Sequence, residues 1–246
     1  MRNDPDKLDA VPAEQRAGLQ RMGRVLALQQ GVDMAAVAAD HLQRCCRALQ
    51  QPGESLVGLA ERLERDRDVC ERLAQALRPR GTLLDTPEHL DAFVDWLRDE
   101  VATGRACRVW VPACRDGLDV ALLALWADAA GLLPHLTVYG TDVSSSADRT
   151  RRGPDLYLLA PALSEPMRQR LVRDGEGAGL RLPPELLKSC SFIPQQLFDI
   201  PSFGGIDLVM ARDIAILLLP GPRRRLLERL HAALAPNGLL WVATNE

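Results

Sequence analysis

The feature that most constrains the fold is a change of sequence pattern near Thr103-Gly104. Before this point, apolar residues recur at spacings of three and four, which is typical of amphipathic helices. After it, short β-rich runs alternate with helical stretches, which is typical of βα units around a parallel sheet. We therefore predict an α/β chain with a helical domain over residues 1–104 and a mainly parallel, Rossmann-like sheet domain over residues 105–246.

Five short segments of the second domain carry the strand pattern. They are residues 108–113, 137–140, 191–194, 206–210 and 239–243. A Pro- and Gly-rich stretch, residues 154–184, separates the second segment from the third, and we expect it to form a small inserted subdomain. Because an open parallel sheet binds ligands at the carboxyl ends of its strands, the residues that directly follow these segments are the candidates for a site.

Composition limits the classes of function. Of the 246 residues, 47% are hydrophobic and 26% are charged, so the chain can bury a core and is not a disordered segment. A formal net charge of −3 provides no field that attracts nucleic acid. The apolar runs fall short of the roughly 20 residues of a membrane helix, and the N-terminus carries no apolar targeting stretch. We expect a cytoplasmic protein that neither binds nucleic acid nor inserts into a membrane.

The cysteines favour reduced thiols over a metal site. All six of them lack the spacing of a zinc site or of a disulfide framework. We therefore predict no metal.

Two glycine-containing turns follow the first two predicted strands. The first, Ala113-Cys114-Arg115-Asp116-Gly117, leads into a helix, where glycine lets the backbone approach a ligand at the helix N-terminus. The second strand ends in Gly140-Thr141-Asp142, which puts a carboxylate 25 positions after Gly117. In this architecture such an acid accepts hydrogen bonds from ribose hydroxyls. Spacing alone leaves a second reading open, in which Asp142 is the N-cap of a helix through Ala147 and Arg151.

The last third of the chain indicates the kind of chemistry. A strand containing Asp207 is followed by a predicted helix over residues 222–234, a Pro-Asn-Gly turn at Pro236 and another strand. This order is typical of the late half of a class I methyltransferase sheet. The GxGxxG spacing of a dinucleotide-binding loop is missing, which disfavours a nicotinamide-dependent dehydrogenase.

Five motifs resemble those of the CheR family of chemotaxis receptor methyltransferases, in the same order and with similar spacing. They are residues 81–90 (GTLLDTPEHL, similar to T-x-F-F-R-D-P-x-x-F), 110–119 (WVPACRDGLD, similar to W-S-A-x-C-S-T-G-E-E), 141–142 (TD, similar to T-D-I), 192–197 (FIPQQL, similar to F-x-x-x-N-L) and 211–214 (ARDI, similar to C-R-N-V). The resemblance implies a helical N-terminal domain plus a class I methyltransferase domain with an inserted subdomain. It also implies transfer of methyl from S-adenosylmethionine to receptor glutamates.

The resemblance implies a set of cofactor-binding residues. They are Ala113, Gly117, Asp119, Asp142, Gln196 and Asp213. We name no catalytic residue, because a glutamate side chain is already an anion at neutral pH and needs no general base to attack a methyl group.

Several matched positions depart from the family pattern. The family's cofactor- and substrate-facing Arg falls on Asp85, and the first Glu of its G-E-E motif falls on Leu118. The Tyr that the family has two residues after this motif falls on Ala121. For Asp85 we favour the role of N-cap to the helix beginning at Thr86-Pro87 over any role in catalysis.

These departures leave two hypotheses open. The first is an active enzyme that methylates glutamates of a chemoreceptor or related signalling protein. The second is a catalytically degenerate regulatory module with the CheR fold, which binds a partner or another nucleotide without methyl transfer. S-adenosylmethionine is the cofactor of the first, and in the second its binding is weak or lost.

Two surfaces are candidates for partners. Arg44 and Arg47, near His41, lie three positions apart on a predicted helix and so share a face, which we expect to meet a protein partner. The last predicted strand, residues 239–243, would be an apolar sheet edge, which natural proteins seldom leave open. We therefore expect either another subunit or a continuation of the chain beyond Glu246 to cover it.

Overall fold

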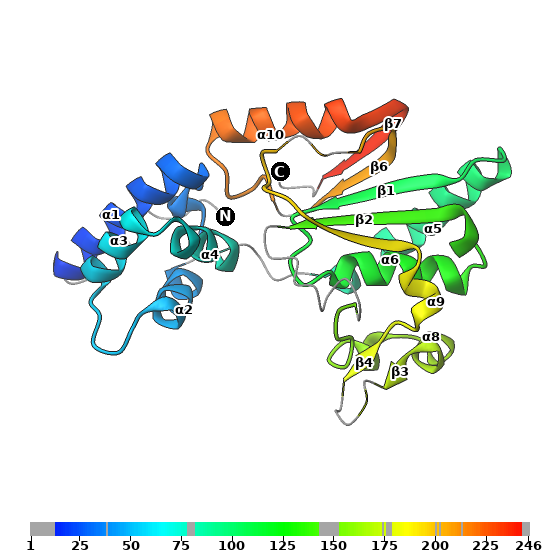
Figure 1. Cartoon of the computed structure of the whole chain (residues 1–246), viewed down its shortest axis with the longest axis horizontal. Helices are drawn as coiled ribbons and strands as arrows, with labels where there is room; N and C mark the ends of the chain where they lie inside the picture. The colour runs from blue at the N-terminus through cyan, green and yellow to red at the C-terminus, as the bar shows by residue number, and fades with distance from the viewer. Residues whose placement is uncertain are drawn as a thin grey trace. The chain divides into compact units, whose positions relative to one another are not determined.

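The computed structural model describes residues 13–37, 39–77, 82–142, 153–173, 175, 179–199, 201, 203–212 and 214–242. The chain divides into two compact units, which we call the helical unit and the sheet unit (Figure 1). Within the described ranges, residues 13–77 and 214–225 belong to the helical unit, and residues 82–212 and 226–242 belong to the sheet unit. The predicted domain boundary at residue 104 stays a prediction, because compactness alone does not show where a domain folds independently.

The helical unit is built mainly from the N-terminal helices. It contains α1 (Ala13–Gln30), the 3-10 turn η2 (Met34–Ala36), α2 (Ala39–Leu49), α3 (Leu56–Arg65) and α4 (Arg67–Ala76). Helix α1 packs along α3 (Figure 1). Gly18 allows this close packing, since a Cβ at that position would lie 2.8 Å from the backbone C of Leu56. Met22, Leu59 and Leu63 are fully buried, as their helical spacing predicts.

A segment from late in the chain completes the helical unit. Val32 pairs with Leu218 in an isolated antiparallel bridge. The N–H of Asp33 donates to the carbonyl of Leu217 at an N···O distance of 2.7 Å, and the N–H of Leu219 donates to the carbonyl of Gly31 at 2.9 Å. The first turns of α10 (Pro220–Ala233) follow directly. Residues 214–225 thus pack with helices from the start of the chain.

The sheet unit contains the five predicted strands. They are β1 (Cys107–Pro112), β2 (Leu136–Asp142), β5 (Cys190–Pro194), β6 (Ile206–Ala211) and β7 (Leu234–Val242). The sheet order is β5-β2-β1-β6-β7, and every pairing is parallel. This confirms the α/β prediction. Because β1 is followed by β2 on one side and lies against β6 on the other, the order reverses at β1, and such a switch point is where open α/β sheets bind ligands.

Helices α5 (Pro87–Ala102) and α6 (Leu118–Ala129) form the core of the sheet unit with the strands (Figure 1). Helix α6 contacts β2, β5 and α5, and its residues from Val120 to Leu125 are all fully buried. A helix that is apolar on every side must be covered on every side, which explains its central place. Gly140 in β2 allows close approach, since a Cβ there would lie 2.7 Å from Cγ2 of Val120.

The predicted insert forms a small subdomain. It contains η5 (Ala160–Ala162), α8 (Glu165–Arg170), the antiparallel pair β3 (Val172–Arg173) and β4 (Leu180–Arg181), and α9 (Pro184–Leu187). Arg170 binds the carboxylate of Asp128 in α6, with an Nε···Oδ2 distance of 2.7 Å. This ion pair ties the insert to the central helix. Across the described ranges, no helix has the length and apolar character needed to span a bilayer.

Candidate functional site

The carboxyl ends of β1, β2 and β5 bring most of the predicted site residues to one edge of the sheet. Ala113 to Asp119 follow β1, Asp142 ends β2, and Gln196 follows β5. The N–H of Cys114 donates to the carbonyl of Thr141 at 2.9 Å, and the N–H of Gln195 donates to the carbonyl of Asp142 at 3.0 Å. Asp213 lies outside the described residues.

The loop after β1 has a strained backbone. Ala113 and Arg115 have positive φ angles of 50° and 53°, in a region that residues other than glycine seldom adopt. Gly117 follows at φ 82° and forms the N-cap of α6. A Cβ on Gly117 would lie 2.5 Å from Cε1 of Phe192 in β5, so glycine is required here by both the angle and the space. Loops of this kind place backbone N–H groups toward ligands.

Asp142 is a buried carboxylate at the centre of this edge. It is only 4% exposed, and its Oδ2 accepts a hydrogen bond from the N–H of Arg115 at 3.0 Å. The bond fixes the loop after β1 against the end of β2. Its assignment to a ribose stays a prediction. The alternative role as N-cap concerns residues 143–152, which are outside the described part of the chain.

Asp119 links α6 to the segment before α5. Its Oδ1 accepts a hydrogen bond from the N–H of Leu83, which begins the 3-10 turn η3 (Leu83–Asp85), at 2.9 Å. Burial raises the pKa of the Asp119 carboxyl above its ordinary value, and this hydrogen bond and the charges of Arg212 and Arg115 partly oppose the rise. Asp119 has a clear structural task, and its assignment to the cofactor stays a prediction.

Asp85 does not cap α5, so that expectation was wrong. Its exposed carboxylate turns back and accepts a hydrogen bond from the N–H of Thr82 at 2.6 Å, within a capping box around η3. Thr86 occupies the N-cap position of α5 instead. The 3-10 turn immediately before α5 offers the Asp85 side chain a nearer backbone donor, which explains the difference.

Two buried polar atoms at the start of α5 have no hydrogen-bond partner in the part of the chain that the structure describes. They are Oγ1 of Thr86 and Nδ1 of His89. The His89 ring packs edge-on against Trp241 near the end of β7, with ring centroids 5.3 Å apart. Neither side chain is among the predicted site residues, since the sequence alone favours a surface or packing role for His89 over a role as a ligand.

The residues at this edge fit an adenosyl cofactor. The donor and acceptor set includes a buried carboxylate at the end of β2, a glycine loop at the start of a 12-residue helix, and the unpartnered atoms of Thr86 and His89. Gln196 is half-buried beside the end of β2. Ala121, at the position of the family's Tyr, is fully buried in the core and takes no part in such a set.

The buried thiols are poor nucleophiles. Burial raises the pKa of Cys46 to about 12 and that of Cys190 to about 12. The pKa values of Cys70 and Cys107 rise to about 11, also chiefly through burial. Since the thiolate is the reactive form, none of these four cysteines is suited to covalent catalysis at neutral pH. Among the residues that the structure describes, no three His, Cys, Asp or Glu side chains are grouped so that they could hold a metal ion.

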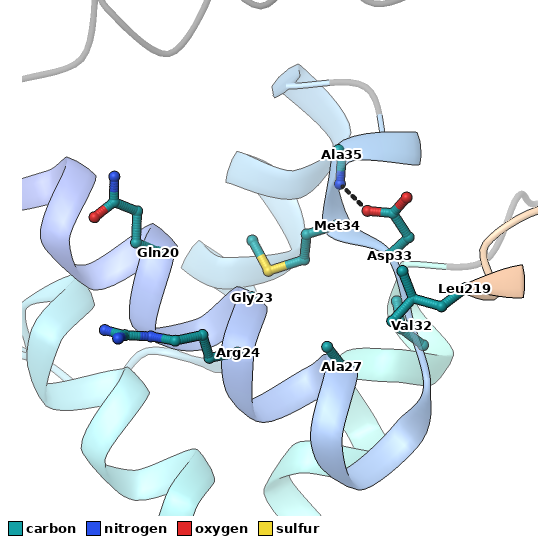
Figure 2. A pocket seen from close by; sticks show the side chains of 9 residues that line it. All are labelled: Gln20, Gly23, Arg24, Ala27, Val32, Asp33, Met34, Ala35 and Leu219. Carbon is teal, nitrogen blue, oxygen red and sulfur yellow. Dashed lines mark hydrogen bonds between the residues drawn. The ribbon is translucent and has the colours of Figure 1, made fainter. Parts of the chain in front are cut away.

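The helical unit carries the predicted partner residues and a pocket. Arg44 and Arg47 are both exposed on α2. A pocket of about 500 Å³ lies in the same unit, with Gln20 and Arg24 at one end, Leu219 at the other and Met34 between them (Figure 2). Asp33 at its rim accepts a hydrogen bond from the N–H of Ala35 at 3.0 Å, so its carboxylate already serves the turn η2.

Comparison with known proteins adds independent information. Residues 83–246 match the family described as CheR methyltransferase, SAM binding domain. An uncharacterized 104.1 kDa protein of Rhodobacter capsulatus is 29% identical over 164 residues, which is 65% of this chain and 17% of that protein. Chemotaxis protein methyltransferase 1 of Vibrio cholerae is 26% identical over 192 residues, 74% of this chain and 70% of the relative. A chemotaxis protein methyltransferase of Vibrio parahaemolyticus is 26% identical over 163 residues, 63% of this chain and 59% of the relative.

Proposed function

We propose, because the chain belongs to the CheR methyltransferase family, that it transfers a methyl group from S-adenosylmethionine to glutamate carboxylates of a chemoreceptor-type signalling protein in the cytoplasm. The observation that carries the proposal is the meeting of the loop after β1 with the buried carboxylate of Asp142 inside the matched range. The chemotaxis methyltransferases among its relatives support the substrate class.

When bound, S-adenosylmethionine supplies a methyl group on a positively charged sulfur. Asp142 would accept hydrogen bonds from the ribose hydroxyls, and the backbone of residues 113–117 and the side chain of Gln196 would border the rest of the adenosyl group. A substrate glutamate has an ordinary pKa of about 4.3, so it arrives as an anion and no residue of the chain has to remove a proton. The protein's contribution is placement of the two reactants, which can supply several kcal/mol of the barrier reduction.

Calorimetric titration with S-adenosylhomocysteine, the demethylated product, tests this assignment. Asp142→Asn retains an oxygen that can accept from the Arg115 N–H, but removes the charge. We expect it to weaken binding at least tenfold, about 1.4 kcal/mol. Asp207→Asn is a matched control, because Asp207 is also buried and accepts a backbone N–H, that of Arg108 at 2.9 Å, at the opposite end of the sheet. Equal affinity of the Asp142 variant and the wild-type chain would contradict the role of Asp142.

The degenerate regulatory module is the second candidate, and the structure of Asp85 favours it. Its carboxylate is exposed and engaged with Thr82, where the family pattern has an Arg. Asp85→Arg combined with Leu118→Glu should tighten S-adenosylmethionine binding if the pocket is otherwise intact. A wild-type chain that binds a signalling protein but neither S-adenosylmethionine nor its product would establish the module and exclude the enzyme.

For the partner, we propose that the α2 face containing Arg44 and Arg47 binds the signalling protein. Their exposure and their spacing on one helix face support this. Arg44→Glu with Arg47→Glu should abolish pull-down of a chemoreceptor cytoplasmic domain. Arg72→Glu, on exposed Arg72 of α4, is the control for a general change of charge. Survival of the pull-down in the double variant would remove this face from consideration.

We also propose that the β7 edge is covered, either by another copy or by further chain. In the described structure β7 pairs with β6 alone, and Leu239 and Val242 are 49% and 36% exposed. Light scattering and hydrogen exchange test this together. A stable monomer in which the amides of Leu240 and Val242 exchange slowly would contradict both forms of cover, since the edge would then already be protected within the chain.

A further inference from the structure

We infer that Thr86 and His89 bind a carboxylate in the sheet unit. The inference rests on the proposed function and names two further positioning residues for it. The observation is that the atoms Oγ1 of Thr86 and Nδ1 of His89 are buried, on side chains that are half-buried, and have no hydrogen-bond partner among the described residues. A buried polar group without a partner costs about 1–3 kcal/mol. Two such atoms three residues apart in one helical turn therefore indicate a ligand that satisfies them.

The local backbone explains why the helix itself does not use these atoms. An N-cap hydroxyl usually accepts from the N–H two or three residues later. Thr86 has φ −139° and ψ 70°, its side chain makes no cap hydrogen bond, and the N–H of His89 donates to the carbonyl of Thr86 at 2.9 Å instead. The hydroxyl is therefore left available at the N-terminus of a 16-residue helix.

The position of the pair places it near the candidate site. The His89 ring lies against Trp241, which pairs with Met210 close to the carboxyl end of β6. The turn immediately before Thr86 is bonded to the start of α6 through the N–H of Leu83 and the carboxylate of Asp119. Both contacts hold the start of α5 near the edge at which β1 and β6 end.

The chemistry of the pair favours an anion. A threonine hydroxyl and the Nδ1–H tautomer of an imidazole both donate hydrogen bonds, and the N-terminus of a helix attracts negative charge. The carboxylate of Asp85 is engaged with Thr82, and that of Asp119 with Leu83, so neither supplies the acceptor. Two carboxylates take part in the proposed reaction, that of the amino-acid end of the cofactor and that of the substrate glutamate.

The test uses the full chain, with Thr86→Val and His89→Phe singly and combined. Phenylalanine retains a ring that can pack on Trp241, and valine retains the shape of threonine. His135→Phe, at an exposed histidine in the turn η4 (Leu133–His135), is the matched control. Calorimetry measures S-adenosylhomocysteine and 5′-methylthioadenosine, which lacks the amino-acid end. NMR of the His89 ring follows titration with glutarate, a mimic of the glutamate side chain.

If the pair holds the cofactor carboxylate, the double variant should bind S-adenosylhomocysteine at least tenfold more weakly while its affinity for methylthioadenosine changes less than twofold. If it holds the substrate carboxylate, S-adenosylhomocysteine affinity should stay constant, glutarate should shift the His89 ring signals, and the Thr86 variant should weaken that response. Unchanged S-adenosylhomocysteine affinity in the double variant, together with a glutarate response of the His89 ring that is absent or that Thr86→Val leaves unchanged, would overturn the inference.

Thermal unfolding separates a ligand-binding role from a structural one. Because the two atoms have no partner within the described structure, the variants should be as stable as the wild-type chain or more stable. A clear loss of stability in both single variants would mean that the side chains bond within the protein, and would also overturn the inference. If the wild-type chain binds no S-adenosylhomocysteine, the proposed function fails, whereas the glutarate response of His89 still decides the inference.

Discussion

The carboxylates of the helical unit and of the sheet unit contribute to stability with opposite pH dependence. In the helical unit, Glu54 pairs with Arg62 at an Nη2···Oε2 distance of 2.7 Å, and the pKa of Glu54 falls below its ordinary value chiefly because of this bond. In the sheet unit, burial raises the pKa of Asp119, whose main partner is a backbone N–H. The comparison teaches that one chemical group, a carboxyl placed against a guanidinium or inside an apolar core, makes stability depend on pH with opposite signs.

Glycines show a parallel difference in packing. Gly53 in the helical unit and Gly117 in the sheet unit have φ angles of 78° and 82°. A Cβ at Gly53 would meet nothing within 4 Å, whereas one at Gly117 would meet Phe192. The same backbone requirement is therefore combined with open space in one unit and with a packed ring in the other.

The largest expected effect comes from alanine at these two glycines. Gly117→Ala should destabilise the sheet unit by about 3 kcal/mol, from the left-handed backbone and the clash with Phe192 together. Gly53→Ala should cost about 1 kcal/mol, from the backbone alone. All four tryptophans (Trp96, Trp110, Trp126 and Trp241) lie in the sheet unit, so their fluorescence during urea unfolding measures the Gly117 variant. Hydrogen exchange of the α3 amides measures the Gly53 variant in the helical unit. Equal losses would contradict the comparison.

Asp119 should give the next largest effect. Asp119→Ala leaves the N–H of Leu83 without an acceptor and should cost about 1–3 kcal/mol. Asp119→Asn keeps an acceptor and removes the charge. Because the folded pKa lies above the unfolded value, the wild-type contribution is largest in acid and falls as pH rises from the unfolded pKa to the folded one. Tryptophan fluorescence should show this decline in the wild-type chain and a flatter profile in the Asn variant; identical profiles would contradict it.

Glu54 should show a smaller effect with the opposite sign. Its folded pKa is lowered, so its contribution is present at neutral pH and is lost as pH falls through the unfolded value toward the folded one. Glu54→Gln should cost about 1 kcal/mol at pH 7 and nothing in strong acid. Hydrogen exchange of the α3 amides measures this. The exposed pair of Arg98 and Asp95 in the sheet unit is the control, and Asp95→Asn should change the stability followed by tryptophan fluorescence by less than about 0.5 kcal/mol.

The strands could be predicted because their pattern is local. Each of the five predicted segments lies in an observed strand, apart from end residues such as Ala113 and from Ala243, which is outside the described residues. The last strand begins earlier than expected, at Leu234, because the chain pairs Leu234 with Ile206 across an irregularity before the regular register from Leu239. Position after a strand was also enough to find Gly117 and Asp142.

The partners of polar side chains could not be predicted in the same way. Asp119 and Leu83 are 36 positions apart, and only the packing of α5 on α6 brings them together. Asp85 and Thr86 compete as caps, and the 3-10 turn that decides between them leaves no periodic signal in the sequence. His89 resembles any polar residue on a helix until the burial of its Nδ1 atom and its contact with Trp241 are known.

The bridge between Val32 and Leu218 has a consequence for folding during synthesis on the ribosome. The helical unit includes residues up to 225, so it cannot be finished when the ribosome has made only its four N-terminal helices. At about 5–20 residues per second, the interval between residues 76 and 225 lasts about 7–30 s. For that time Val32, which is buried in the finished protein, lacks its bridge partner Leu218 on the nascent chain. We therefore expect newly made helices of this unit to be accessible to chaperones and proteases until residues 214–225 have been translated.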